Sequence, residues 1–444
     1  MAANTMTPPM TTPSTPTVDS LTKEGIDLQA PNSNVQAGKR PLAPLNASSV
    51  QVNLTKSPRD VPAADDPAVA SSSVCTDHMV TVSWNASTGW EAPQIKPYGP
   101  LSLMPTASVL HYATECFEGL KLYRGYDNKL RFFRISRNCA RMRNSANRIA
   151  LPDFEPEELV KLILALAKID GSKWLPKDTH KGKFLYCRPT LISDDASLGV
   201  QRPVKALLFV ILTMFPDMSD PKALEKKKPA ASDVATEISP TSTLPQSNEV
   251  QGLKLLASSE ETIRAWPGGF GYAKLGANYG PSLVAQGVAR DRGFNQILWL
   301  FGTENYVTEA GASNFFIVMK NKETGAEELI TAGLEDKVIL EGVTRASILQ
   351  LTEERLPELK IVERKFTMTE IKEAMEEGRV VEAFAAGTAF FVAPVGLIEW
   401  KGEQMRIPTV EGHTGKYARQ LRAWLSGIMY GEEQHEWGVV VDEN

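Results

Sequence analysis

Cysteine and histidine are scarce in this chain of 444 residues. It has 4 cysteines, without a C-x-x-C pair, and 5 scattered histidines, without an H-E-x-x-H motif. A disulfide scaffold and a structural zinc site therefore have no support in the sequence, and we predict no metal site. So few cysteines are typical of a protein from a reducing compartment.

Long apolar runs and an excess of positive charge are also absent. The longest apolar stretch, residues 206–215, is far shorter than the ~20 residues of a membrane-spanning helix. Lys and Arg total 48 against 53 Asp and Glu, which gives a net charge of -5 and no broad electrostatic surface for nucleic acid. We expect neither a membrane nor a nucleic acid as partner.

Two segments lack the apolar periodicity of a folded domain. Residues 1–45 are rich in Thr, Pro, Ser, Asn and Ala, which predicts a disordered extension. They have no secretory apolar region and are not Arg-rich, so a cytoplasmic location is favoured and a mitochondrial one is the alternative. Residues 216–251 are rich in Pro, Ser and Lys, which predicts a linker enlarged by an insertion. The two segments delimit a small domain at 46–215 and a large one at 252–444.

Alternating helix and strand patterns on both sides of the linker predict an α/β fold. The clearest helix is 156–170, where Pro156 is in the first turn and an apolar stripe follows. The other predicted helices are 139–148, 282–292, 344–355 and 368–378. The predicted strands are 81–84, 129–133, 205–215, 296–301, 314–319 and 380–384.

The densest glycine segment, residues 268–281, contains a single lysine, Lys274. Glycines allow the backbone to approach a ligand closely. A lysine in a crowded apolar setting loses solvation, and its neutral amine is the nucleophile of Schiff-base chemistry. Composition alone favours the simpler interpretation, a flexible loop with a surface lysine.

Three later segments also have two interpretations. Glu309, in 308–314, is either a carboxylate at a strand edge that could pair with a cationic ring nitrogen or part of a simple turn. Residues 342–345 open a helix whose N-terminus suits a phosphate, although Thr344 is also an N-cap candidate. Residues 386–389 follow a strand and offer a hydroxyl and N–H groups, or form only a turn.

The joint occurrence of these segments, in this order, resembles the fold-type IV pyridoxal-phosphate enzymes, and more closely the branched-chain amino acid aminotransferases. Further motifs carry the resemblance: Leu-His-Tyr at 110–112, Cys-Phe-Glu-Gly at 116–119, Leu-Tyr-Cys-Arg-Pro at 185–189, Ile-Arg-Ala-Trp at 263–266 and His-Glu-Trp at 435–437. The resemblance implies a two-domain α/β (α+β) fold. The smaller N-terminal domain and the larger, cofactor-binding C-terminal domain would enclose the site between them.

The resemblance also implies a cofactor, pyridoxal 5'-phosphate, and roles for the residues that would hold it. Lys274 would bond to the cofactor and, once displaced by an amino acid, move the proton from its Cα atom. Glu309 would face the pyridine nitrogen, and Tyr279 the phenolic oxygen. The phosphate would be bound by Arg141, Val343, Thr344 and Thr388.

A substrate pocket is implied in the same way. Tyr112, Phe117, Tyr186 and Ala312 would line it, and Arg188 would meet the distal carboxylate of glutamate. Thr388 and Ala389 would lie near the substrate carboxylate. Leu198 and Val200 would come from a partner subunit, which implies a homodimer. Without the resemblance, Tyr112, Phe117, Leu198 and Val200 would be interpreted as ordinary core residues.

The implied activity is transfer of an amino group between leucine, isoleucine or valine and 2-oxoglutarate. Three departures from the family pattern concern the pocket: residues 213–216 lead into the insertion without the usual tyrosine, Ala312 replaces a threonine, and Phe390 and Phe391 replace smaller residues. They suggest a divergent paralogue that acts on other hydrophobic or aromatic amino acids. The remaining alternatives are a lyase or D-amino acid transaminase of the same fold, and a non-catalytic cofactor-binding scaffold.

Overall fold

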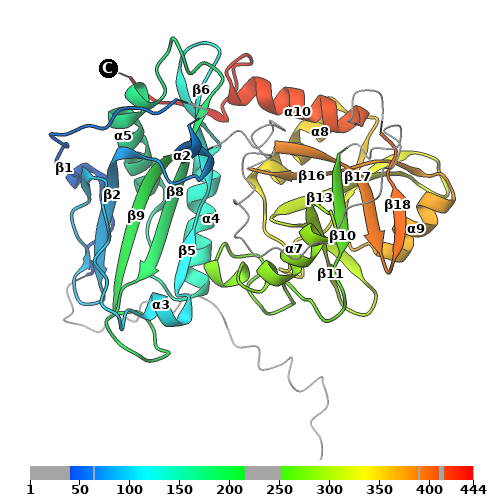
Figure 1. Cartoon of the computed structure of the whole chain (residues 1–444), viewed down its shortest axis with the longest axis horizontal. Helices are drawn as coiled ribbons and strands as arrows, with labels where there is room; N and C mark the ends of the chain where they lie inside the picture. The colour runs from blue at the N-terminus through cyan, green and yellow to red at the C-terminus, as the bar shows by residue number, and fades with distance from the viewer. Residues whose placement is uncertain (1–40, 64–65, 216–251, 389–390, 410–414, 444) are drawn as a thin grey trace, which may run out of the picture. The chain divides into compact units, whose positions relative to one another are not determined.

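The computed structural model of the chain describes residues 41–63, 66–215, 252–388, 391–409 and 415–443 (Figure 1). The expected linker at 216–251, nearly all of the expected N-terminal extension and Ala389 lie outside these residues, so their roles remain predictions. Residues 42–444 make up one compact unit. None of the helices in the described part is long and apolar enough to cross a membrane.

Ten strands of the described chain form the first sheet. They are β1 (Gln51–Val52), β2 (Cys75–Asn85), β3 (Gly89–Trp90), β4 (Gln94–Pro97), β5 (Glu115–Phe117), β6 (Leu120–Arg124), β7 (Leu130–Phe133), β8 (Phe184–Ser193), β9 (Lys205–Met214) and β19 (Gly438–Val440). Their order is β1-β4-β2-β9-β8-β6-β7-β19, with β3 beside β2 and β5 beside β8. The chain therefore returns to this sheet with its last strand.

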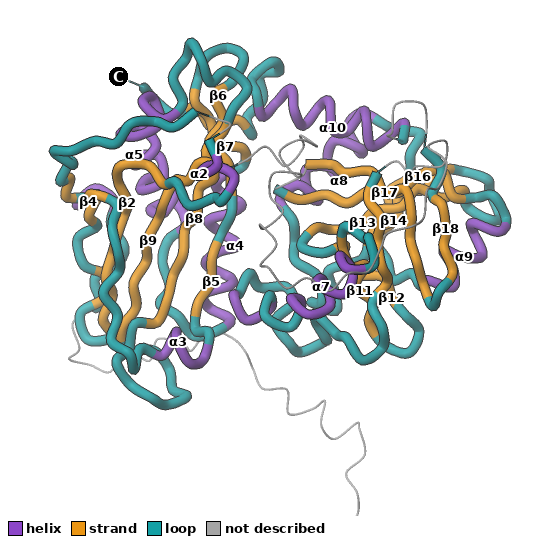
Figure 2. The backbone as a smooth tube through the Cα atoms, in the orientation of Figure 1, coloured by secondary structure: helices purple, strands orange, loops and turns teal. Residues whose placement is uncertain are grey.

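Helices α4 (Ile135–Arg148) and α5 (Pro156–Trp174) pack on this sheet (Figures 1 and 2). The α5 stripe of apolar side chains is buried as its spacing predicted. Helix α4 begins four residues earlier than predicted because Ile135 extends its buried stripe. Three short helical segments complete this part of the chain: η1 (Ala47–Ser49), α2 (Pro67–Ala70) and α3 (Ser108–Tyr112).

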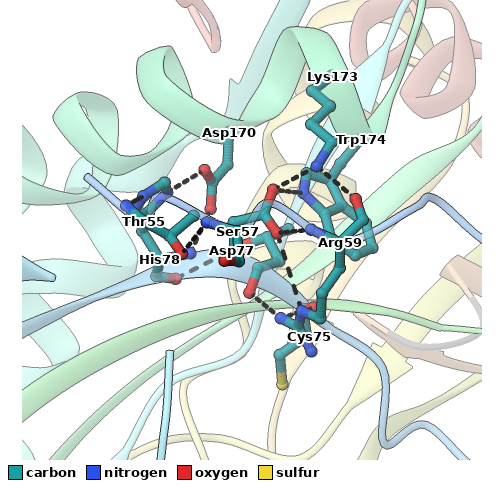
Figure 3. Close-up of polar contacts among 10 residues, drawn as sticks. Thr55, Ser57, Arg59, Cys75, Asp77, His78, Asp170, Lys173 and Trp174 are labelled. Atoms are coloured by element: carbon teal, nitrogen blue, oxygen red, sulfur yellow. Dashed lines mark hydrogen bonds and ion pairs between the residues drawn. The ribbon is translucent and has the colours of Figure 1, made fainter. Parts of the chain in front are cut away.

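Helix α5 also continues past the predicted end at residue 170, and polar contacts to β2 explain why (Figure 3). Asp170 Oδ1 lies 2.7 Å from His78 Nδ1, and Trp174 Nε1 donates to Asp77 Oδ2 at 3.0 Å. The backbone N–H of Thr55 donates to His78 Nε2 at 2.9 Å, so both ring nitrogens of this histidine are bonded. The cluster joins the helix end to the sheet and leaves His78 no nitrogen with which to bind a substrate.

Nine strands of the described chain form the second sheet. They are β10 (Leu253–Ala257), β11 (Gln296–Phe301), β12 (Tyr306–Ala310), β13 (Ser313–Lys320), β14 (Glu327–Thr331), β15 (Lys360–Glu363), β16 (Val380–Gly387), β17 (Phe391–Trp400) and β18 (Glu403–Arg406). Their order is β12-β11-β10-β17-β16-β13-β14-β15, with β18 beside β17 and a further pairing of β12 with β13. Parallel and antiparallel pairs are mixed, because β10 runs parallel to both of its neighbours.

The helical elements of this half are η3 (Gly276–Asn278), α7 (Ser282–Asp291), α8 (Val343–Arg355), α9 (Met368–Glu376) and α10 (Lys416–Met429). Helix α10 contacts α8, β16 and β17 (Figure 2). Its first turn is held by Glu382 of β16, whose carboxylate accepts from the N–H groups of Tyr417 and Ala418 at 3.0 and 2.7 Å. A side chain from the sheet thus supplies the cap that the helix itself lacks.

Two local interpretations from the sequence are wrong. Glu309 is not in a turn but in strand β12, paired with Asn314 of β13, because both strands have buried partners in the sheet. Thr344 is not the N-cap of α8: Gly342 takes that position, and Thr344 is buried as the second residue of the helix.

Candidate active site

Lys274 lies where the glycine-rich segment runs alongside β5 of the first sheet. Its Nζ atom is 3.2 Å from the Tyr279 hydroxyl and 4.9 Å from the centre of the Phe117 ring. Its backbone is fixed on both sides, because its N–H donates to Ser145 Oγ at 2.8 Å and its carbonyl accepts from Phe117 N at 3.1 Å. The segment is therefore pinned to β5 and α4, and the interpretation as a free surface loop is wrong.

Glu309 is a buried carboxylate with one satisfied oxygen and one without a hydrogen bond. Its Oε1 accepts from Leu340 N at 3.2 Å and from Asn314 Nδ2 at 3.3 Å. Its Oε2 has no hydrogen-bond partner among the described residues, although the Arg264 guanidinium is in ion-pair contact with it. Burial raises the pKa of Glu309, and the charges of Arg264, Lys274 and Arg141 offset part of that rise. Because its pKa is raised, the Glu309 carboxyl group is suited to share a proton, through Oε2, with a basic group of a bound ligand.

Arg141 is held by a bidentate ion pair. Its Nε and Nη2 atoms donate to the two oxygens of Glu118 at 2.7 and 2.9 Å, and Nη1 donates to the Glu341 carbonyl at 2.8 Å. Asn138 donates to the same Glu118 carboxylate at 2.8 Å. Burial would raise the pKa of Glu118, but Arg141 outweighs burial and lowers it. The guanidinium is thus fixed, with its charge retained, on the face of α4 toward α8.

Val343 and Thr344 lie at the N-terminus of α8, close to Arg141. A cavity of about 150 Å³ is lined by Arg141, Val343 and Glu341, together with Arg137, Ala140 and Asn144. The first N–H groups of a helix and its dipole favour an anion. Thr388 joins Val343 and Thr344 in the lining of a second, small cavity, and its hydroxyl donates to the Gly119 carbonyl at 3.4 Å. We call Arg141, Val343, Thr344 and Thr388 the phosphate end of the site.

The residues fit pyridoxal 5'-phosphate on three observations of this structure. An amine lies beside a phenol, at Lys274 and Tyr279. A buried carboxylate oxygen of Glu309 lacks a hydrogen bond. A fixed guanidinium and a helix N-terminus lie together at the phosphate end. These are the donor and acceptor types that the aldehyde carbon, the pyridine nitrogen and the phosphate of this cofactor require.

Phe117, Tyr186 and Arg188 lie on β5 and β8, and we call them the side-chain end of the site. The Arg188 guanidinium is 4.7 Å from the centre of the Phe117 ring, and its Nη2 is 3.2 Å from the Tyr186 hydroxyl. Its Nε atom is buried and has no hydrogen-bond partner in the described part of the chain. Phe215 stacks on Tyr186, with the two ring centres 5.0 Å apart. It adds an aromatic ring to this wall, in the segment that lacks the tyrosine usual in the family.

The remaining predicted pocket residues are not gathered into this wall. Tyr112, Leu198 and Val200 are 39%, 63% and 89% exposed, so the interpretation of these three as ordinary core is wrong. Ala312 lines a cavity of about 270 Å³ together with Tyr279 and Thr388. Ala389 lies outside the described residues.

Several residues of the site were not predicted. Glu118 belongs to the Cys-Phe-Glu-Gly motif at 116–119. Its neighbours do not reveal that it holds Arg141, and those of Ser145 do not reveal that it holds the Lys274 backbone. Arg264 and Asn314 both contact Glu309 from other elements. Glu118, Ser145 and Arg264 are far along the chain from the residues that they contact, so a local pattern carries no signal for these contacts. Asn314 is only five residues from Glu309, and its contact depends on the pairing of β12 with β13.

The sequence matches the family "Amino-transferase class IV" over residues 115–398. The cytosolic branched-chain-amino-acid aminotransferase of Saccharomyces cerevisiae is 45% identical over 408 residues, which cover 90% of this chain and 99% of the yeast protein. The cytosolic enzyme of the same name from Mus musculus is 45% identical over 364 residues, covering 82% of this chain and 86% of the mouse protein.

Solved structures share the fold at lower identity. The Escherichia coli branched-chain amino acid aminotransferase aligns with a TM-score of 0.60 at 20% identity and covers 82% of this chain and 99% of its own. The Thermobaculum terrenum enzyme, solved in its PLP-form, aligns with a TM-score of 0.58 at 23% identity, covering 82% of this chain and 98% of its own. The expected fold-type IV α/β architecture is confirmed by these likenesses.

Proposed function

The chain belongs to the branched-chain amino acid aminotransferase family of class IV aminotransferases, and we propose that it is a pyridoxal 5'-phosphate-dependent transaminase. It moves the amino group between the branched-chain L-amino acids leucine, isoleucine and valine and the acceptor 2-oxoglutarate. The observation that carries the proposal is the placement of the Lys274 amine next to Tyr279, with Glu309 and Arg141 close enough to act on each other's charge.

Each residue of this site has a task in the reaction. When bound, the cofactor supplies the electron sink that accepts the electron pair left on the substrate Cα atom. Lys274 Nζ anchors the cofactor and, once released, takes the proton from Cα. Glu309 would hold a proton at the pyridine nitrogen through Oε2, the oxygen that lacks a hydrogen bond in the described chain and that Arg264 contacts as an ion pair. Tyr279 orients the phenolic oxygen, and the phosphate end keeps the ring in place.

We assign the exposed apolar residues to a second copy of the chain. Leu198 and Val200 lie beyond β8, with large exposed areas that a single chain leaves in water. In a homodimer these two residues would close the partner's pocket. We place the protein in the cytoplasm. Light scattering coupled to size exclusion measures the mass: twice that of one chain supports this assignment, and the mass of a single chain contradicts it.

Visible spectroscopy tests the function directly. The purified protein with pyridoxal 5'-phosphate should show a band that L-leucine removes and 2-oxoglutarate restores. Lys274→Ala should lower turnover by at least about 10³-fold, because the anchor and the proton acceptor are lost together. Lys322→Ala, at an exposed lysine in the turn after β13, is the matched control. A protein that binds the cofactor but never responds to any amino donor would be a non-catalytic scaffold.

A wider donor range is the second candidate function. The small side chain of Ala312 lines the 270 Å³ cavity beside Tyr279 and Thr388, which leaves room for a larger donor. Transamination rates with leucine, isoleucine, valine, phenylalanine and methionine as donors distinguish the branched-chain range from the wider range. Activity restricted to the three branched donors contradicts the wider range.

A further inference from the structure

Glu115 shares one face of the first sheet with the side-chain end of the site. Strands β5 and β8 are antiparallel neighbours, with Glu115 opposite Ile192 and Phe117 opposite Thr190. Alternate residues of a strand point to the same side, and directly opposite residues share a side. Glu115, Phe117 and Arg188 therefore lie on one face, and the carboxylate is part of the same surface as the guanidinium.

The Glu115 carboxylate lies against the backbone next to Lys274. A Cβ atom on Gly276 would be only 1.8 Å from Glu115 Oε1, so the absence of a side chain at Gly276 makes room for this carboxylate. The backbones of Cys116 and Leu275 form an isolated antiparallel β-bridge, which holds β5 against the segment that contains Lys274. Glu115 is half-buried, and the only charge in the described chain that clearly acts on it is Arg188.

The two charges complement each other without closing an ion pair. Burial raises the pKa of Glu115, and the attraction of Arg188 offsets part of that rise. Arg188 in turn has one phenol contact and a buried Nε atom without a hydrogen-bond partner among the described residues. Apart from the Phe117 and Tyr186 rings, this partly buried cation has few partners, and a nearby negative charge would stabilise it.

The source of that negative charge differs between the two kinds of substrate. When leucine fills the pocket, its side chain brings no charge, and Glu115 is the counter-charge that remains for Arg188. When glutamate or 2-oxoglutarate binds, its distal carboxylate reaches Arg188 and meets repulsion from Glu115. The same carboxylate thus favours one substrate and opposes the other.

We propose that Glu115 is a specificity-determining residue, which sets the balance between uncharged and dicarboxylate substrates in one pocket through its charge on the sheet face that it shares with Arg188. The inference rests on the proposed function, since it assigns both substrate kinds to this pocket.

Equilibrium binding of two unreactive acids to the cofactor-loaded protein tests the inference. Glutarate represents the dicarboxylates, and 4-methylpentanoate represents the leucine side; titration calorimetry gives both dissociation constants. Glu115→Gln should tighten glutarate about fivefold and weaken 4-methylpentanoate about twofold. In steady-state assays the ratio of kcat/KM for leucine to that for glutamate should fall accordingly, through KM rather than kcat.

Two variants separate charge from structure. Glu115→Asp keeps the charge and should hold the ratio of the two dissociation constants within about twofold of wild type. Glu91→Gln, at an exposed glutamate directly after β3, should change neither constant. The inference is overturned if Glu115→Gln moves both acids in the same direction or leaves both unchanged, or if Glu115→Asp shifts the ratio as far as Glu115→Gln does.

Failure of the proposed function is seen separately. If the wild-type protein never passes an amino group from leucine to 2-oxoglutarate, the transaminase proposal fails whatever the binding constants show. If wild type transaminates and Glu115→Gln does not alter the ratio, the inference about Glu115 alone fails.

Discussion

The phosphate end and the side-chain end of the site each depend on one arginine, and the two are held very differently. Arg141 has all three of its nitrogens bonded, two of them to the buried carboxylate of Glu118. Arg188 has a single phenol contact, two aromatic faces and an unpartnered Nε atom in the described chain. In the proposed reaction Arg141 binds the same phosphate in every cycle, so it can be fixed in advance. Arg188 would have to accept both charged and uncharged side chains, so it cannot be fixed in the same way.

Burial separates the residues around the cofactor site from those proposed for the dimer contact. Glu118, Thr344 and Glu309 are 0%, 5% and 2% exposed, whereas Leu198 and Val200 are mostly exposed. One chain buries the residues around the cofactor site by its own packing, but it leaves Leu198 and Val200 in water. If the proposed homodimer forms, these two residues are the ones whose surroundings depend on the second copy.

Replacing the buried carboxylate at Glu309 should have the largest effect on catalysis. Glu309→Gln keeps the shape and the contacts of Oε1 but cannot hold a negative charge at the pyridine nitrogen, so kcat with leucine should fall about 10²-fold or more. Stopped-flow absorbance measures the half-reaction. Glu304→Gln, an exposed glutamate in the turn before β12, is the control. An unchanged kcat would remove Glu309 from the mechanism.

Breaking the ion pair of the phosphate end should give the largest effect on stability. Glu118→Gln leaves Arg141 buried without its counter-charge, so the free energy of unfolding should fall by about 3 kcal/mol. The matched variant Arg188→Gln should cost less than about 1 kcal/mol, because no buried partner is orphaned. Urea denaturation of the cofactor-free protein compares them. Equal losses of unfolding free energy in the two variants would mean that Arg141 and Arg188 are held equally firmly, which would contradict this difference between the two ends.

The ion pair of Arg124 with Glu443, which belongs to neither end of the site, gives the size of a purely structural effect. Arg124, which is fully buried, donates to both oxygens of Glu443 at 2.7 and 2.8 Å. Burial would raise the pKa of Glu443, but hydrogen bonds from Arg124 and Ser172 outweigh it and lower the pKa to about 2.

Because the folded protein has the lower pKa, this carboxylate stabilises the fold above the unfolded pKa, which is near 4.5. The contribution is lost as the pH falls from there through about 2. Glu443→Gln should therefore lower the free energy of unfolding at pH 7 by about 1.5 kcal/mol, without a change in kcat. The difference from wild type should shrink as the pH falls toward 2. A difference independent of pH would show that the charge of Glu443 is not what stabilises the fold.

The sequence by itself determined the periodic elements and the residues whose chemistry is local. The apolar stripe of α5, the strand β11 and the α8 start were predicted to within a few residues, because burial repeats at the spacing of the element. Ordered motifs also carried the family resemblance and singled out Lys274, Glu309 and Arg141 in advance.

Only the tertiary structure decided what each of these residues contacts. It placed Glu309 in a paired strand, bonded Arg141 to Glu118 and brought Glu115 onto the face of Arg188. Strand pairing joins residues far apart in the chain, and the charge next to a site depends on these pairings rather than on its sequence neighbours. The sequence therefore identifies the cofactor chemistry, while the folded sheet decides which charged residues share a face with Arg188.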